Sequence, residues 1–495
     1  MTEQLPALQI LITMLAAPMC VLVRHAKVSW AIAFGANIFA FWVAWQLLLQ
    51  VQDNGAIRYA LGGWAAPTGI EYYIDTVNAA IVMLVSGISS VVLLYAYSSV
   101  AKAIPRAKHY LFYAAWLLCV TGLMGIVITG DAFNVFVFLE VSSLATYMLI
   151  SFGDDRRALT ASFRYLILGS VGASFILIGI GFLYAATGTL NMIDLAERIP
   201  DSQSQRAVLV AFSFITLGVL IKAAVFPLHA WLPNAYTYAP VAVTAFLAGT
   251  ATKVSLYVLL RFFFSIFGED YSFGQLFLNA ILLPAAIGGF VLMSLVAVFQ
   301  TDLRRMLAYS SVAQIGYIVA GFSMASQAGL AAGIVHIVNH ALIKASLFMA
   351  VGCIIYRVGH AHIPSFDNLF KRMPFTCVAF MLSGAGLIGI PLTVGFVSKF
   401  TLIGAAMDKG WWLLAALILI SSLLAVMYIG RVVEIMLFRQ SRESGQASTG
   451  MAEAPLSMLI PMYALVIVAL YFGIYGSETL GVANEAALQL LGGFK

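Results

Sequence analysis

Ionisable side chains interrupt several long apolar stretches of this sequence. In residues 218–233, GVLIKAAVFPLHAWLP, Lys222 lies among apolar residues and is followed by Pro227, His229 and Pro233. If such stretches cross a membrane, each charge near the bilayer centre costs at least about 2.5–3.5 kcal/mol on insertion scales. Intramembrane charges usually face the interior of a helix bundle and mark an ion or proton path. The segment is therefore a candidate transport site.

Further ionisable residues share this setting: Glu140, Lys253, His336, His340, Lys344 and Lys399. His336, His340 and Lys344 are spaced by four residues, so a helix places all three on one face. Inert alternatives exist for single members of the set. Glu140 and Lys222 can form a buried ion pair without a transport role, and Lys253 can extend its amine to the membrane surface.

Lysine and histidine suit a chain of proton carriers. Burial in hydrocarbon disfavours the charged form of a lysine, so a buried lysine can load and release a proton. Histidine titrates near neutral pH without any perturbation. We expect Lys222 to carry a proton and Glu140 to act as its switch, because a close carboxylate stabilises the charged amine and a distant one does not. Pro227 would open the helix so that water and His229, a further candidate for proton translocation, can reach Lys222.

The composition is that of a membrane protein. Of 495 residues, 62% are hydrophobic and 9% are charged, against roughly 25% charged in a soluble domain. The mean hydropathy is +0.97 and the pI is near 8.9. The net charge of +5 is best explained by basic cytoplasmic loops. Basic clusters with interleaved aromatics do not occur, so we expect no nucleic-acid partner.

The cysteines do not predict a metal site or a disulfide framework. Cys20, Cys119, Cys353 and Cys377 lie within or beside apolar segments and form no CxxC pair. The sequence also contains no Rossmann glycine motif and no cysteine cluster for iron and sulfur. We therefore expect no cofactor and no metal, and we expect this chain not to be a redox catalyst. The first apolar run precedes Arg24 and Lys27, which indicates a retained helix and not a cleaved signal peptide.

Hydropathy predicts an all-α polytopic membrane protein with about fourteen spanning helices, because a span takes about 20 apolar residues. The expected spans are 5–23, 28–50, 76–98, 110–129, 133–152, 163–186, 207–231, 239–263, 276–299, 307–325, 329–356, 376–403, 411–437 and 456–475. The connections are too short to hold a soluble domain.

The loop charges predict the orientation. Fifteen basic residues fall in odd-numbered loops or at the helix ends beside them: Arg24, Lys27, Lys102, Arg106, Lys108, Arg156, Arg157, Arg164, Arg304, Arg305, Arg357, Lys371, Arg372, Arg439 and Arg442. The even-numbered loops hold four, namely Arg58, Arg198, Arg206 and Lys409. Cytoplasmic loops carry the excess of lysine and arginine, so both termini should face the outer side of a bacterial cytoplasmic (inner) membrane.

Two helices should be broken at membrane depth. Pro227 follows Lys222 in helix 7, and Gly389, Pro391 and Gly395 precede Lys399 in helix 12. Broken backbone is tolerated there only where it lines a protein-buried or water-filled cavity. Breaks in corresponding places indicate an internal repeat, with helices 4–8 and 9–13 as the candidate halves.

Several motifs resemble one family closely: IKAAVFPLHAWLPNAYTYAP, VTAFLAGTATKVSLYVLLRF, DLRRMLAYSSVAQIGYI, HIVNHALIKASLF and GIPLTVGFVSKF. They are similar to the antiporter-like membrane subunits of complex I, of membrane-bound hydrogenases and of multi-subunit Mrp-type sodium/proton antiporters. The stretches GGWAAPTGIEYYIDTVNA and GDAFNVFVFLEVSSLATYMLI look most like the D subunit of the Mrp type. The resemblance covers nearly the whole chain.

The resemblance implies fourteen core helices with two inverted five-helix repeats. It implies N-terminal helices 1–3 in residues 1–108, a first repeat in 109–265, a second in 266–440 and helix 14 in 441–495. Proton-translocation roles fall on Glu140, Lys222, Lys253, His336, His340, Lys344 and Lys399, the residues that match the family's motifs.

The family works in hetero-oligomers. The expected function is proton conduction in a Na⁺/H⁺ antiporter, together with the large A-type subunit, small membrane subunits and membrane lipid. Because lysine repels sodium, the Na⁺ path would lie in a partner or at an interface. The alternative is a proton-pumping subunit of a redox complex, and a purely structural membrane scaffold is a third reading.

Overall fold

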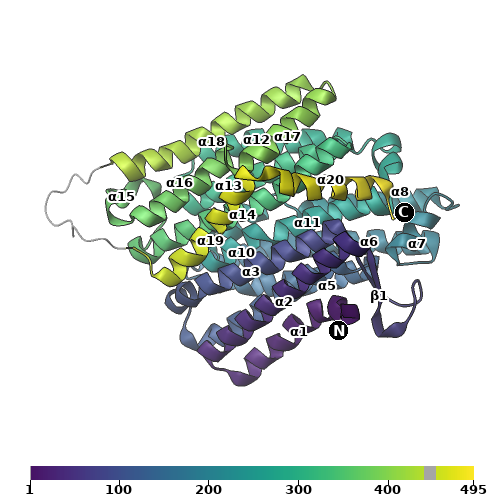
Figure 1. Ribbon diagram of the computed structural model, residues 1–495, viewed down its shortest axis with the longest axis horizontal. Helices are drawn as coiled ribbons and strands as arrows, with labels where there is room; N and C mark the ends of the chain where they lie inside the picture. The colour runs from purple at the N-terminus through teal and green to yellow at the C-terminus, as the bar shows by residue number, and fades with distance from the viewer. Residues whose placement is uncertain (1, 440–452, 495) are drawn as a thin grey trace.

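The computed structural model describes residues 2–439 and 453–494, and long helices run between its two ends (Figure 1). The spans begin and end near the predicted positions: α1 Leu5–Val23, α2 Ala26–Asn54, α3 Thr76–Ala103, α4 His109–Ile128, α5 Ala132–Ser151, α6 Arg157–Thr187, α8 Gln205–Lys222 with α9 Trp231–Tyr238, α10 Val241–Gly249 with α11 Ala251–Leu260, α12 Asn279–Val298, α13 Leu303–Ser323, α14 Gln327–Val358, α16 Pro374–Ile388 with α17 Val394–Asp408, α18 Trp412–Phe438 and α19 Leu456–Ile474.

The fold class is confirmed. Among the described residues, 13 helices are long and apolar enough to cross a membrane. The broken pair α16 and α17 supplies the fourteenth span, because neither half is long enough alone. The protein is therefore a multi-pass membrane protein with the predicted number of spans.

Hydropathy missed several short or polar elements. A hairpin of β1 (Ile57–Ala60) and β2 (Glu71–Ile74) pairs antiparallel, with Ile57 opposite Ile74. Two short helices lie in loops, α7 (Met192–Arg198) and α15 (Leu369–Arg372). Short 3-10 turns cover 2–4, 61–63, 106–108 and 363–365, and π-helical turns cover Arg261–Ile266 and Asp270–Gln275.

The C-terminal region contains one helix more than expected. Beyond α19, α20 (Gly476–Gly492) buries an alanine-rich face formed by Ala483, Ala486, Ala487 and Leu490. Its other residues include Glu478, Glu485 and Gln489, so the segment is amphipathic and too polar for a hydropathy window to detect. The start of the predicted C-terminal segment, including Arg442, lies outside the described residues.

Contacts between loops place the even-numbered loops together at one end of the bundle and the odd-numbered loops together at the other. Spans that alternate in direction require this arrangement. Among the even-numbered loops, Tyr72 bridges Thr129 and Asp131 bridges Asn191. Among the odd-numbered loops, Asp302 bridges His362, and Asn368 donates a backbone hydrogen bond to the carbonyl of Arg439. Figure 1 shows both termini, β1 and α7 towards one end and α15 at the other.

Helix α14 lies at the centre of the bundle, where it packs on α10, α13, α16, α17, α19 and α20. Its residues are buried almost continuously from Gly329 to Ile354. Peripheral helices such as α1, α2 and α18 instead expose large apolar side chains. The helix that carries His336, His340 and Lys344 is therefore shielded from the surroundings on every side.

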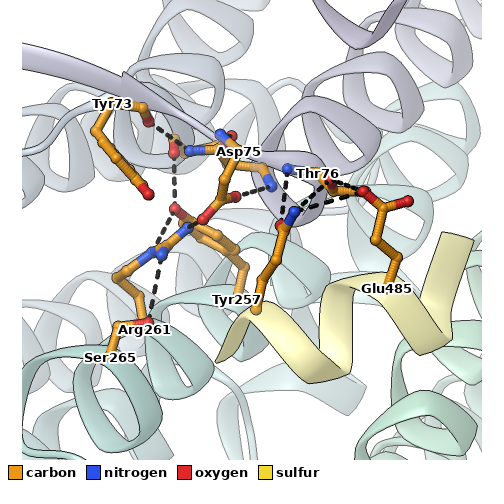
Figure 2. Close-up of polar contacts among 10 residues, drawn as sticks. Tyr73, Asp75, Thr76, Tyr257, Arg261, Ser265 and Glu485 are labelled. Carbon is orange, nitrogen blue, oxygen red and sulfur yellow. Dashed lines mark hydrogen bonds and ion pairs between the residues drawn. The ribbon is translucent and has the colours of Figure 1, made fainter. Parts of the chain in front are cut away.

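A buried ion pair ties α3 to the turn after α11 at the end that carries the hairpin (Figure 2). Arg261 donates to Asp75 over 2.7 Å, and both side chains are under one-tenth exposed. The other Asp75 oxygen accepts from the backbone N–H of Asn78 and caps α3. Helix α20 joins this cluster, because Thr76 donates through its backbone N–H to Gln489 and through its hydroxyl to Glu485.

Candidate functional site

Most of the candidate residues are buried. The exposed fraction is 5% for Lys222 and Lys399, 2% for His336, 1% for His340 and zero for Lys253 and Lys344. Glu140 and His229 are half-buried. Each of these two still has one buried atom that finds no hydrogen-bond partner in the part of the chain that the structure describes, Oε1 of Glu140 and Nδ1 of His229. Buried unpaired polar atoms are costly, so each points to an ordered water or a functional role.

The first helix break follows Lys222, as the sequence predicts. Helix α8 ends at Lys222, and helical backbone resumes only at Trp231. Pro227, which has no N–H, lies in the intervening segment together with His229, whose ring stacks on Phe226. The Trp231 indole donates to the carbonyl of Ile221 over 2.9 Å. The same carbonyl accepts from the backbone N–H of Ala224 over 3.1 Å, so the side chain of Trp231 adds a second hydrogen bond at the end of α8.

Lys222 is held by a hydroxyl and not by a carboxylate. Its Nζ donates to Ser143 Oγ on α5 over 2.8 Å. Glu140 lies one helical turn before Ser143 but forms no ion pair with Lys222 in the described chain. A cavity of about 30 Å³ adjoins the amine and reaches Ala251 at the start of α11. Such a volume is large enough for a water molecule.

Lys253 is fully buried beside a second irregularity. Thr250 interrupts the span between α10 and α11 with φ of −127° and ψ of −62°. Lys253 Nζ donates to the carbonyl of Ala248 and, over 3.3 Å, to Thr252 Oγ1. Since none of this side chain is exposed, its amine does not extend to the membrane surface.

The three residues on α14 have different surroundings. The His336 ring nitrogens contact Ser398 Oγ at 2.8 Å and Gln314 Oε1 at 2.9 Å. Within the described residues, neither ring nitrogen of His340 has a hydrogen-bond partner. Lys344 donates to the carbonyl of Leu307 over 2.9 Å and to the hydroxyl of Ser310. The two imidazoles lie nearly parallel with centroids 6.3 Å apart. Of the two histidines, His340 is the one whose ring nitrogens are both available to water.

The second helix break places Lys399 over a helix end. Helix α16 ends at Ile388, and Gly389 adopts a φ of +90°, which only glycine adopts readily. Pro391 lies between this residue and α17. Lys399 Nζ donates to the carbonyls of Leu387 and Ile388 over 3.0 and 2.9 Å. A cation at the C-terminus of a helix is favourable because free carbonyls and the helix dipole meet there.

Sequence reasoning missed the uncharged residues that connect these groups. The Tyr317 ring lies 4.9 Å from Lys399 Nζ and its centroid lies 5.7 Å from that of His336. Gln314, Ser398, Ser143 and Ser310 are the other hydrogen-bond partners. All five residues fall in stretches quoted above for the family resemblance, but uncharged side chains on apolar helices gave no signal that separates them from packing residues.

The groups form a row that crosses the molecule from α5 to α17. The cavity at Lys222 reaches the start of α11, which carries Lys253. Lys253 donates to the carbonyl of Ala248 on α10, and α10 packs on α14. His336 on the same helix connects to α17 through Ser398. The row therefore runs across the helices and not along any one of them.

A known family model covers this whole row. The model described as NADH:quinone oxidoreductase/Mrp antiporter, TM, matches residues 129–425, which is more than half of the chain and includes every candidate ionisable residue. The chain belongs to this family. The resemblance that the motifs indicated is thereby confirmed.

Individual relatives belong to two kinds of complex, NADH-quinone oxidoreductases and Na(+)/H(+) antiporters. NADH-quinone oxidoreductase subunit N of Desulforudis audaxviator is 39% identical over 87% of this chain and 87% of its own length. The D subunit of the Na(+)/H(+) antiporter of Alkalihalophilus pseudofirmus is 32% identical over 90% of this chain and 89% of its own length. The similarity to the antiporter's D subunit therefore extends well beyond the quoted stretches.

Solved structures that resemble this chain also come from two kinds of complex, an Mrp complex and a respiratory membrane complex. A chain of the Mrp complex from Dietzia sp. DQ12-45-1b superposes with a TM-score of 0.90 at 26% identity, covering 99% of this chain and 97% of that one. A chain of the membrane-bound sulfane sulfur reductase, an archaeal respiratory membrane complex, gives 0.91 at 30% identity, covering 99% and 98%. The fold is thus shared with subunits of transporter and respiratory complexes.

Proposed function

We propose that this chain is the proton-conducting membrane subunit of a hetero-oligomeric Na⁺/H⁺ antiporter. Protons would move along Glu140, Lys222, Lys253, the α14 trio (His336, His340 and Lys344) and Lys399. The observation that carries the proposal is the row of buried amines and imidazoles, anchored at two helix breaks. The partners would be the large A-type subunit and small membrane subunits, as the similarity to the antiporter's D subunit and to the Mrp complex suggests.

The surroundings of the lysines support proton exchange. Ser143 holds Lys222, Leu307 and Ser310 hold Lys344, and two backbone carbonyls hold Lys399. These oxygens are uncharged, so none of them fixes a lysine in its charged form as a close carboxylate does. Approach of Glu140 to Lys222 would favour proton loading, and its withdrawal would favour release.

The same chemistry argues against a sodium path through the row. Sodium needs several oxygen ligands, and a row of amines repels it. We therefore place the Na⁺ path in a partner subunit or at an interface.

The second candidate is a proton-pumping subunit of a redox complex. The 39% identity to NADH-quinone oxidoreductase subunit N and the match to the sulfane sulfur reductase complex favour it. In either complex we propose that this chain is a translocating subunit and not the redox catalyst.

The two-repeat organisation and the orientation extend this proposal. The α8–α9 and α16–α17 breaks occupy the fourth span of the proposed halves, 109–265 and 266–440, which supports an internal repeat. The loop charges favour a cytoplasmic location for the odd-numbered loops in a bacterial inner membrane, with both termini outside. Reporter fusions at Lys371 test this orientation, and an outer location for Lys371 would refute it.

The test uses inverted vesicles from an antiporter-deficient host that expresses the whole operon. Respiration energises the vesicles, and a pH-sensitive dye reports proton movement when sodium is added. We expect sodium to collapse the pH gradient with the natural sequence and with the loop control Lys409→Ala. Lys222→Ala should give no response, because the row then lacks its first amine.

Each result is read only in complexes whose assembly is checked by co-purification. A normal sodium response with Lys222→Ala would contradict conduction along this row. If the assembled natural complex gives no sodium response, the redox-driven pump becomes the better assignment.

A further inference from the structure

A wide cavity lies apart from the row of buried lysines. It has a volume of about 560 Å³ and opens between the start of α2, the end of α3, the start of α4 and Tyr356 near the end of α14. All four helix ends adjoin odd-numbered loops. The cavity therefore lies at the end of the bundle that the loop charges assign to the cytoplasm.

Cations without carboxylate partners surround the cavity. Lys27, Lys102 and Arg106 line it and are exposed, and none of the three forms an ion pair within the described residues. Within the same part of the chain, no acidic residue lines the cavity. Lys102 donates to the carbonyl of Tyr356 and lies 4.3 Å from its ring. One of the cations is thus held in place while its charge remains available to an anion.

One wall of the cavity is aromatic and fixed. Trp30 on α2 donates its indole N–H to the carbonyl of Leu93 over 2.9 Å and packs edge-on against Tyr97 at 4.9 Å. Leu94 lies one turn below Tyr97 on α3, and both are more than one-third exposed. An apolar surface therefore continues from the polar cavity towards the middle of the membrane.

We propose that this cavity binds the headgroup of an anionic phospholipid from the cytoplasmic leaflet. The phosphate would meet Lys27, Lys102 and Arg106, and an acyl chain would follow Tyr97 and Leu94. Basic pockets between spanning helices on the cytoplasmic side suit anionic headgroups. A zwitterionic choline headgroup would bring its own cation towards the three basic residues. The apolar surface below the cavity favours a lipid over free phosphate. The proposal does not depend on which ion the complex transports.

The test measures lipid retained by the purified complex. Complexes are reconstituted in nanodiscs of mixed phosphatidylglycerol and phosphatidylcholine, then released and weighed by native mass spectrometry. The triple variant Lys27→Gln/Lys102→Gln/Arg106→Gln removes the cations of the cavity, and Ala101→Trp fills the cavity while keeping them. The matched control Arg156→Gln/Arg164→Gln/Lys371→Gln removes three exposed cations from the same end of the bundle.

We expect the natural complex and the control to retain phosphatidylglycerol selectively. Both cavity variants should retain at least about tenfold less phosphatidylglycerol, since the triple variant loses cations that each contribute to binding and Ala101→Trp occupies the space of the headgroup. Excess inorganic phosphate should not displace the lipid. Equal retention in all variants, no selective retention by the natural complex, or displacement by phosphate alone would each overturn the proposal. Since lipid binding is measured without sodium, failure here and failure of the antiport assay are distinguishable.

Discussion

At the residue scale, the buried lysines each perform a structural task that their types alone do not reveal. Lys399 caps the end of α16 through two carbonyls, and Lys222 donates to a serine on a neighbouring helix. A lysine that only stabilises the fold and a lysine that also carries protons make the same contacts. Variants that keep the contacts but lose proton release can separate these roles.

Lys399 offers such a separation. Lys399→Arg keeps a positive charge and its donors but cannot release a proton, whereas Lys399→Met removes the donors too. We expect both variants to lose sodium-driven proton movement. Only Lys399→Met should lower the unfolding midpoint, because unpaired buried carbonyls cost about 1–3 kcal/mol.

The control for this pair is Lys409→Arg in an even-numbered loop, which should behave as the natural sequence does. The measurements are the dye assay in vesicles and the thermal unfolding midpoint of the purified complex. Normal exchange with Lys399→Arg would mean that proton release from residue 399 is not part of the mechanism.

At the element scale, the broken helices depend on close backbone contact. A Cβ atom added at Gly395 would lie 1.8 Å from the carbonyl oxygen of Gly386, which is closer than any real contact. These two residues bring α17 against α16 and so place Lys399 over the helix end. Proline and glycine thus act together, because the proline prevents a continuous helix and the glycine permits the close return of the chain.

Gly395→Ala is expected to disturb this packing. The added methyl group must push α17 away from α16, and we expect lower complex yield and loss of exchange. Gly404→Ala in the same helix is the matched control, because no atom of the residues that the structure describes lies within 4 Å of its added Cβ and alanine favours helix by about 1 kcal/mol. Comparable yield and exchange for the two variants would show that the close contact is dispensable.

At the scale of the whole molecule, distant segments are joined where hydropathy predicts only loops. The buried Asp75–Arg261 pair connects α3 with the turn after α11, and α20 attaches to the same end of α3 through Glu485 and Gln489 (Figure 2). Helix α20 also packs along α14. The C-terminal segment therefore contacts both the first spans and the central helix that carries the α14 trio.

Asp75→Asn should destabilise the protein by about 3–5 kcal/mol, because it leaves Arg261 as an unpaired buried cation. Asparagine is as good an N-cap as aspartate. The loss of stability would therefore come from the missing negative charge and not from a weaker N-cap. The double variant Asp75→Asn/Arg261→Gln should regain part of the stability. The unfolding midpoint of the purified complex measures all of these changes.

The partly exposed pair Arg198–Asp194 provides the comparison. Its N–O distance is also 2.7 Å, but the arginine side chain is 47% exposed, so Asp194→Asn should cost only about 0–1 kcal/mol. Equal losses of stability from Asp75→Asn and Asp194→Asn would show that burial does not determine the cost of breaking these ion pairs.

The sequence by itself determined the spans and the residues worth testing. Apolar runs of membrane length predict helices because backbone in hydrocarbon must bond internally, and ionisable residues within those runs are conspicuous because they are costly. Pro227 and Pro391 likewise predicted the breaks, since proline has no N–H and clashes with the preceding turn. These properties depend on residues that are close together in the sequence and not on the tertiary structure.

Only the tertiary structure decided which groups meet. Residue types alone would pair Glu140 with Lys222, yet the amine bonds Ser143, and the carboxylate forms no ion pair with it in the described part of the chain. Tyr317 joins His336 to Lys399 across three helices, and α20 docks at the start of α3. Such contacts join residues far apart in the chain, and helix packing, which no local pattern encodes, determines their distances.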